Sequence, residues 1–145
     1  MNRLGYVITI PFDRNSKQWL IVKPKNMDVW TFPFTEAGVE TEFDACIRLC
    51  HTQLGLPKNE PWSKRLIANS VKEKINANNG VITEFINMWF LIHMNSIVSY
   101  DSDIYESALY VPKSDILSYI PLGHRNNRYP NEVSNIILHK SGLLK

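Results

Sequence analysis

The sequence has few cysteines and no long apolar stretch, and each absence excludes a class of protein. Only two cysteines are present, Cys46 and Cys50, so no framework of disulfides stabilises the chain. No apolar run approaches the roughly 20 residues that a helix needs to span a bilayer. Residues 1–5 lead straight into a strand-like run and contain no apolar signal-peptide core. We therefore expect a cytoplasmic protein without a membrane partner.

Charge and composition are those of an ordinary folded domain. A net charge of +2 is too small to indicate nucleic-acid binding by itself. Hydrophobic residues make up 44% of the chain, which argues against disorder. Because the chain has 145 residues and no repeat or linker, we expect one domain over residues 1–145 with a substantial core.

Segments rich in β-branched and aromatic residues predict a sheet. The first two segments are joined by the turn-like residues 13–16 and should form a hairpin. Residues 76–80 are a second turn signal, and the long apolar run after them is typical of a central strand that is buried on both faces. The predicted strands span residues 4–12, 18–23, 29–32, 65–72, 81–94 and 107–111.

The clearest predicted helix spans residues 41–54, where Thr41 can cap the start and Gly55 follows the end. Later helices are expected at 112–119 and 131–141. A hairpin, a helix, several strands and late helices favour an α+β fold, or a helix–sheet–helix sandwich. The apolar stripe of the first helix repeats at three- and four-residue spacing and consists of Phe43, Cys46, Ile47, Cys50 and Leu54.

Between Trp30 and Leu56, an aromatic run that ends in Phe32-Pro33 precedes a helical pattern that contains Arg48 and stops at Gly55. This layout resembles the Nudix box, a loop–helix–loop motif that holds divalent cations against a diphosphate. The family pattern is G-x5-E-x7-R-E-U-x-E-E-x-G-U, where U is aliphatic, and Arg48 anchors it here. The resemblance implies a Nudix-like α/β/α sandwich, with a mixed sheet between helices, over most of the chain. The matching residues are Trp30, Phe32 and Pro33 before the box, and Glu40, Arg48, Cys50, Gly55 and Leu56 within it.

Other positions depart from the family pattern. Leu49 replaces the Glu after Arg48, and Thr52 and Gln53 replace the pair of Glu residues. Phe34 replaces the first Gly, so its ring would occupy the close backbone approach that the diphosphate uses. In the family, helix carboxylates bind Mg²⁺, which neutralises the diphosphate and activates a water. The resemblance therefore implies a degenerate box and disfavours hydrolysis by the family mechanism.

Acids near the helix start are candidates to replace the missing carboxylates. Glu40, Glu42 and Arg48 are the candidate catalytic residues, and Mg²⁺ is expected only if hydrolysis survives. The favoured alternative is that the acids complement the helix dipole and remain solvated. Arg48 can support the loop, as in the family, or pair with Asp44 one turn earlier. The candidate metal ligands are Glu36, Glu40, Glu42, Asp44 and Glu84.

Basic and aromatic side chains are candidates to bind a nucleotide or another small phosphorylated ligand. Trp30 and Phe32 share one face of a predicted strand and could stack a base, although core packing is commoner. The polar loop 123–130 either clamps a phosphate or is a solvated connection between helices. The candidate ligand-binding residues are Lys23, Trp30, Phe32, Phe34, Arg125 and Arg128.

Three functional hypotheses follow from this pattern. The favoured one is a non-hydrolytic module that binds a nucleotide-like ligand, or a protein or RNA partner. The alternative is a divergent Mg²⁺-dependent Nudix pyrophosphohydrolase that acts on a nucleoside diphosphate derivative. The third is a structural subunit with a filled cleft. Cys46 and Cys50 are expected to be small buried hydrophobes, because a zinc site needs four ligands that this sequence does not supply together.

Overall fold

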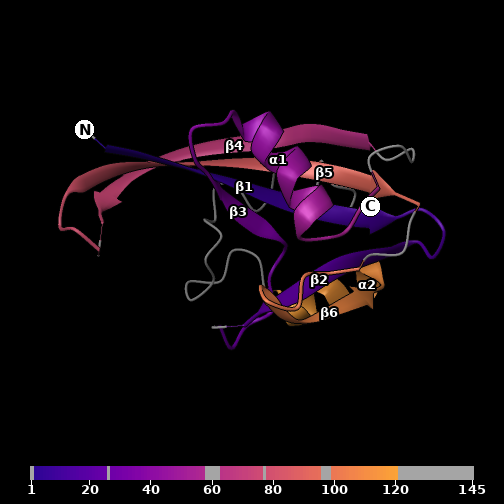
Figure 1. Cartoon of the computed structure of the whole chain (residues 1–145). Helices are drawn as coiled ribbons and strands as arrows, with labels where there is room; N and C mark the ends of the chain where they lie inside the picture. Colours follow the sequence, from indigo (N-terminus) through magenta and orange to yellow (C-terminus); the bar gives the residue numbers. More distant parts are fainter. Residues whose placement is uncertain (1, 26, 58–62, 77, 96–98, 121–145) are drawn as a thin grey trace.

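Over the residues that the structure describes, the chain forms a mixed sheet with one helix on each face (Figure 1). The computed structural model describes residues 2–25, 27–57, 63–76, 78–95 and 99–120. Its helices are α1 (Glu42–Thr52) and α2 (Lys113–Tyr119). Its strands are β1 (Asn2–Asp13), β2 (Gln18–Pro24), β3 (Phe34–Ala37), β4 (Ser63–Ile75), β5 (Ile82–Met94) and β6 (Tyr105–Val111).

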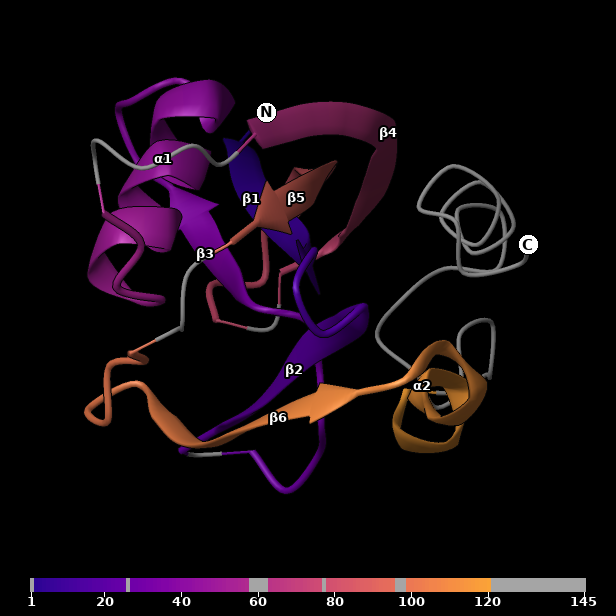
Figure 2. The ribbon, with the colours of Figure 1, turned by 90° about the vertical axis from the view of Figure 1, so that its right-hand side faces the viewer.

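The strand order is β4-β5-β1-β2-β6, and β3 also pairs with β1. β1 is parallel to β5, whereas the other pairings are antiparallel, so the expected mixed sheet is confirmed. One edge of β1 is shared, because β3 pairs with Gly5–Ile8 and β2 pairs only with Phe12 and Asp13. Along its first half β1 therefore pairs with β3, and at its end it pairs with β2. The β2–β6 pair consequently diverges from the other strands of the sheet (Figure 2).

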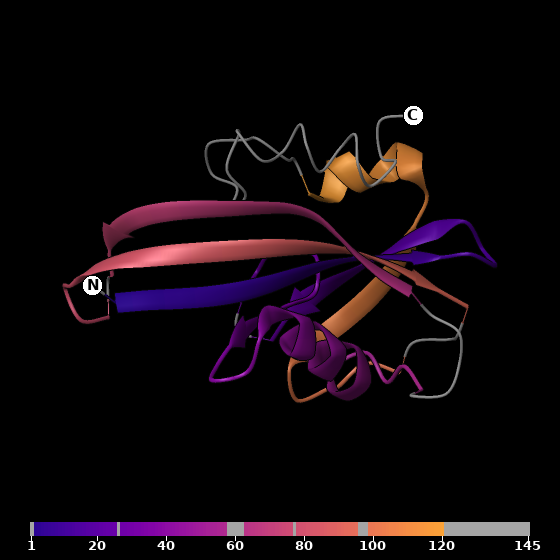
Figure 3. The same cartoon turned by 90° about the horizontal axis from the view of Figure 1, so that it is seen from above.

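The two helices pack against opposite faces of the sheet, which confirms the sandwich (Figure 3). Ala45, Cys46, Leu49 and Cys50 of α1 lie in a core that also contains Phe90. The core on the other face holds two residues from the α2 region, together with residues from four strands. Its members are Ile8, Ile10, Trp19, Ile21, Phe32, Trp89, Leu91, Val111, Ile116 and Ile120.

The strand predicted at residues 29–32 is wrong. Thr31 makes only an isolated bridge to Val22, and β3 begins after Pro33. After this bridge the chain crosses from β2 to β1, where the Pro33 carbonyl accepts bonds from the Thr9 backbone N–H and hydroxyl. Pro33 has no N–H to donate to a ladder, which suits a crossover better than a strand interior.

The other predicted strands are confirmed with small shifts in their ends. The predicted turn joins β4 to β5, with Ile75 opposite Ile82 and Gly80 at φ +69°. Trp89 and Phe90 lie in cores on opposite faces, as expected for a central strand. The helix predicted at 131–141 lies outside the described residues.

The apolar stripe of α1 is rotated relative to the prediction. Phe43 is 48% exposed, whereas Leu49 is fully buried. Cys46 and Cys50 are both buried, as expected, and the Cys46 thiol and burial raise the pKa of the Cys50 thiol. Neither α1 nor α2, the helices within the described residues, has the length and apolar character to cross a membrane.

Candidate functional site

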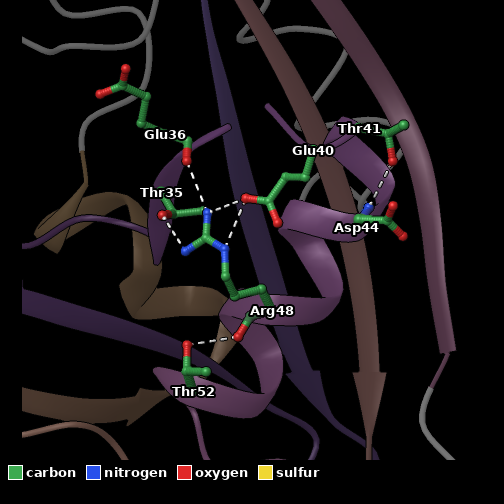
Figure 4. A network of polar contacts seen from close by, with 7 residues as sticks. All are labelled: Thr35, Glu36, Glu40, Thr41, Asp44, Arg48 and Thr52. Carbon is green, nitrogen blue, oxygen red and sulfur yellow. Dashed lines mark hydrogen bonds and ion pairs between the residues drawn. The ribbon is translucent and has the colours of Figure 1, made fainter. Parts of the chain in front are cut away.

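Arg48 fixes the loop between β3 and α1 (Figure 4). Its Nη2 and Nε atoms lie 2.6 and 2.9 Å from Oε1 of Glu40. Nη1 donates to the Thr35 hydroxyl at 3.4 Å, and Nη2 donates to the Glu36 carbonyl at 3.0 Å. Of the two roles considered for Arg48, these contacts are those of a loop support. A planar guanidinium suits this task because its donors are held in one rigid fork.

The hydrogen bond from Arg48 lowers the pKa of the Glu40 carboxyl below its ordinary value. A lowered pKa in the folded state contributes stability above the unfolded-state pKa, about 4.3 for Glu, and that contribution is lost as pH falls through the folded pKa. We predict that acid destabilises the wild type more than Glu40→Gln below about pH 4. Urea denaturation at a series of pH values measures this, and parallel pH profiles would contradict it.

The last turn of α1 carries the positions where the resemblance places metal-binding carboxylates. Leu49 is fully buried in the core. The Thr52 hydroxyl donates to the Arg48 carbonyl at 2.7 Å. Gln53 is buried, and its side-chain oxygen accepts a 2.5 Å hydrogen bond from the Tyr105 hydroxyl. Each of these side chains is thus engaged in packing or hydrogen bonding within the fold.

The loop before β6, together with the first β6 residue Tyr105, covers this end of α1 and is called the 99–105 loop below. The Ser99 N–H donates to the Leu54 carbonyl at 3.1 Å, and the Asp101 N–H donates to the Gln53 carbonyl at 2.9 Å. Gly55 has φ +66° and lies against the Ser99 backbone. The loop therefore supplies donors to carbonyls that a helix end leaves unpaired. Sequence reasoning missed the Tyr105–Gln53 contact, since no local pattern links residues 52 positions apart.

The candidate metal ligands occupy different environments. Glu40 is held by Arg48, and Glu84 is paired with Arg3 at 2.9 Å. Glu36 and Asp44 are exposed. Oε1 of Glu42 lies 3.5 Å from the place that a Gly5 Cβ would take. Within the part of the chain that the structure describes, no three His, Cys, Asp or Glu side chains are grouped so that they could hold a metal ion.

Of the candidate ligand-binding residues, the three aromatic ones gather at one core, whereas Lys23 is paired with carboxylates. Lys23 pairs with Asp28 at 3.2 Å and with Glu106 at 3.7 Å, and these carboxylates raise its pKa. Phe32 is buried in the core, which leaves no face for a base. Trp30 and Phe34 pack against that core, and the Trp30 ring meets Tyr119 edge-on, with 5.9 Å between centroids. Arg125 and Arg128 lie outside the described residues.

Comparison with solved structures shows that this chain has the Nudix fold. It is similar to an Ap4A hydrolase of C. elegans, with TM-score 0.61 and 11% identity over 99% of this chain and 98% of the other. The NUDIX domain of NrtR from Shewanella oneidensis, complexed with ADP ribose, gives TM-score 0.68 and 11% identity over 98% and 88%. A MutT NUDIX hydrolase from Burkholderia pseudomallei gives TM-score 0.60 and 15% identity over 97% and 98%.

Sequence comparison adds no relative to these structures. No family model matches the chain, and no curated protein sequence matches it. The shared property is therefore the fold, and the chemistry must be argued from the side chains of this chain.

Proposed function

We propose that this chain is a Nudix-fold binding module that does not hydrolyse diphosphates and that takes a nucleotide-like ligand or a macromolecular partner. The state of α1 supports the absence of hydrolysis. Leu49 is buried, Thr52 bonds to its own helix, and Gln53 bonds to Tyr105. Mg²⁺ binds in proteins through carboxylates and waters, and these three side chains bring no negative charge. The box is accordingly proposed to be degenerate.

The acids that remain do not offset this loss of charge. Glu40 and Glu84 are each neutralised by an arginine. Glu36 and Asp44 are exposed to solvent, where a carboxylate keeps its hydration shell. A pair of metal ions that clamps a diphosphate needs several carboxylates at close quarters. We infer that Glu40 supports the loop before α1, that Glu84 links β5 to β1, and that the two acids in the first turn of α1 complement the helix start.

A nucleotide-like ligand is consistent with the neighbouring structures. The NUDIX domain of NrtR was crystallised with ADP ribose, and it shares the present fold. If this chain bound a nucleotide without a metal ion, it would recognise the ligand without hydrolysing it. A ligand that binds only the folded state raises stability by about 2.7 kcal/mol at 100 times its Kd, so binding is measurable as a higher Tm.

An assay of hydrolysis with a metal ion and an assay of binding without one test the proposal on the same preparation of protein. We expect no turnover of ADP ribose or Ap4A with Mg²⁺ or Mn²⁺, as followed by chromatography of the products. The Tm of the same preparation is expected to rise with at least one nucleotide in the presence of EDTA. An active Nudix hydrolase assayed in parallel controls for the substrates and metals.

The outcomes distinguish the three hypotheses. Metal-dependent turnover that Glu40→Gln or Glu42→Gln abolishes would establish the divergent hydrolase and overturn the proposal. A raised Tm with a nucleotide would exclude a structural subunit with a filled cleft. An unchanged Tm, without turnover, would remove the nucleotide arm of the proposal and leave a macromolecular partner or the structural subunit. The variants themselves must retain the wild-type Tm within a few degrees, so that loss of turnover is not loss of fold.

A further inference from the structure

We propose that the α1-side face of the β4–β5 hairpin is a docking surface for an apolar, basic segment of a partner protein. The surface is defined by exposed side chains on α1, β4 and β5. Phe43, Leu66, Ile75 and Ile82 are 48, 37, 68 and 57% exposed, respectively. Large apolar side chains that share one face and remain exposed commonly mark an interaction site.

The register of the strands places these residues on one face. Phe90 faces the α1 core, and Ile82 lies on the same side because alternate residues of a strand share a face. Ile75 is directly opposite Ile82, and Leu66 is directly opposite Phe90. The Phe43 ring lies edge-on against the Phe90 ring, with 5.3 Å between centroids, so α1 contributes to the same surface.

Among the described residues, no helix covers the outer part of this face. α1 packs on β1 and β3, and it reaches β5 through Phe43. Figure 3 shows β1, β4 and β5 running on well past α1 toward the hairpin turn. In α/β architectures both faces of a sheet are normally covered by helices, which makes an apolar helix a suitable occupant.

Charge selects a basic partner. Glu84 shares this face by alternation, and Glu73 is directly opposite it on β4. Arg3 pairs with Glu84, and Lys64, opposite Ile92, lies on this face at the other end of β4. Glu73 therefore leaves a net negative charge at the hairpin end of the surface, beside Ile75 and Ile82. Glu42, in the first turn of α1, adds a further acid at the helix end of the surface. Lysine and arginine side chains can cover apolar surface with their stems while their charges reach these carboxylates.

The same charges disfavour other occupants. A second copy of this chain would bring a surface with the same negative charge at its hairpin end, and charges of one sign at an interface cost binding energy. Phosphate groups of a nucleotide, an RNA or an anionic lipid would meet an excess of carboxylates at the hairpin end of this surface. This surface lies apart from the end of α1 that the 99–105 loop covers. The inference gives a place and a chemistry to the macromolecular partner of the proposed function, and it does not depend on the absence of hydrolysis.

The test uses two synthetic amphipathic helices as probes, one of leucine and lysine and one of leucine and glutamate. Isothermal titration into the full chain should detect the lysine peptide and not the glutamate peptide. Ile75→Ser/Ile82→Ser should weaken that binding at least about tenfold, and Glu73→Lys should weaken it in the same direction. Val29→Ser and Asp103→Lys are matched controls, because both positions are exposed and lie outside this surface.

Each outcome decides the proposal. Weakening by the surface variants, with controls that bind like the wild type, would support it. Equal binding of the two peptides, or equal weakening by the controls, would overturn it, as would the absence of binding. Metal-dependent turnover in the hydrolysis assay would overturn the proposed function alone and would leave this surface untouched.

Discussion

Leu49→Glu is expected to abolish cooperative folding at neutral pH, although it restores the family residue at that position. Leu49 is fully buried against the sheet in the α1 core. Removing a buried leucine side chain costs about 2–5 kcal/mol, and a buried unpaired charge adds several more. Because domains are stable by only about 5–15 kcal/mol, the sum falls in the range of the whole stability of a domain. Circular dichroism during urea denaturation measures the loss.

Two control variants show whether the loss of stability comes from burying a charge or from changing a residue of this helix. Leu49→Met keeps the volume and should cost less than about 1.5 kcal/mol. Thr52→Glu adds a carboxylate to an exposed position in the same helix, and should change stability by at most about 0.5 kcal/mol. If Leu49→Glu unfolded at the same urea concentration as the wild type, the face of α1 that carries residue 49 would have to meet solvent, and the metal site would become feasible again.

Gly55→Ala is expected to be the most destabilising of three glycine substitutions. Gly55 has φ +66°, and a Cβ added there would lie 2.6 Å from the Ser99 carbonyl oxygen. A left-handed backbone costs a residue with a side chain about 1–2 kcal/mol. Overpacking adds about 1–3 kcal/mol, here because the backbone of the 99–105 loop must move. We therefore expect a loss of about 2–5 kcal/mol in the free energy of unfolding.

The other two glycines separate the cost of the left-handed backbone from the cost of the contact with Ser99. Gly80 has φ +69° with no atom near its added Cβ, so Gly80→Ala should cost only about 1–2 kcal/mol. Gly38 has neither feature, and Gly38→Ala should be neutral within about 0.5 kcal/mol. Urea denaturation of the three variants ranks them. A Gly55→Ala variant no worse than Gly80→Ala would contradict the contact between the 99–105 loop and the end of α1.

Local sequence patterns predicted those parts of the fold that local chemistry determines. Thr41 caps α1 as expected, because its side chain can reach the backbone N–H of Asp44. The turn before β5 followed from Asn and Gly residues that tolerate tight backbone conformations. The central position of β5 followed from its apolar length. The cap and the turn each join residues that are close in sequence, and the apolar length of β5 can be seen within one segment.

Contacts between distant residues account for the parts that could not be predicted. The crossover at Pro33 depends on bonds from Thr9 in β1. The environment of Gln53 depends on Tyr105, and the pairing of Lys23 depends on Glu106. The rotation of α1 that buries Leu49 and exposes Phe43 depends on which strands it covers. An apolar stripe in the sequence predicts that one side of the helix is buried, but it does not fix to within one residue which side that is.

Titration of Mn²⁺ and Mg²⁺ into the wild-type chain, followed by calorimetry, tests most directly whether the family chemistry is absent. Thr52 and Gln53 bring no charge, and Glu40 is neutralised by Arg48. We predict that neither metal binds in the millimolar range or tighter, and that Glu40→Gln and Glu42→Gln leave the titration unchanged. Binding in that range, lost in either variant, would contradict a non-hydrolytic role.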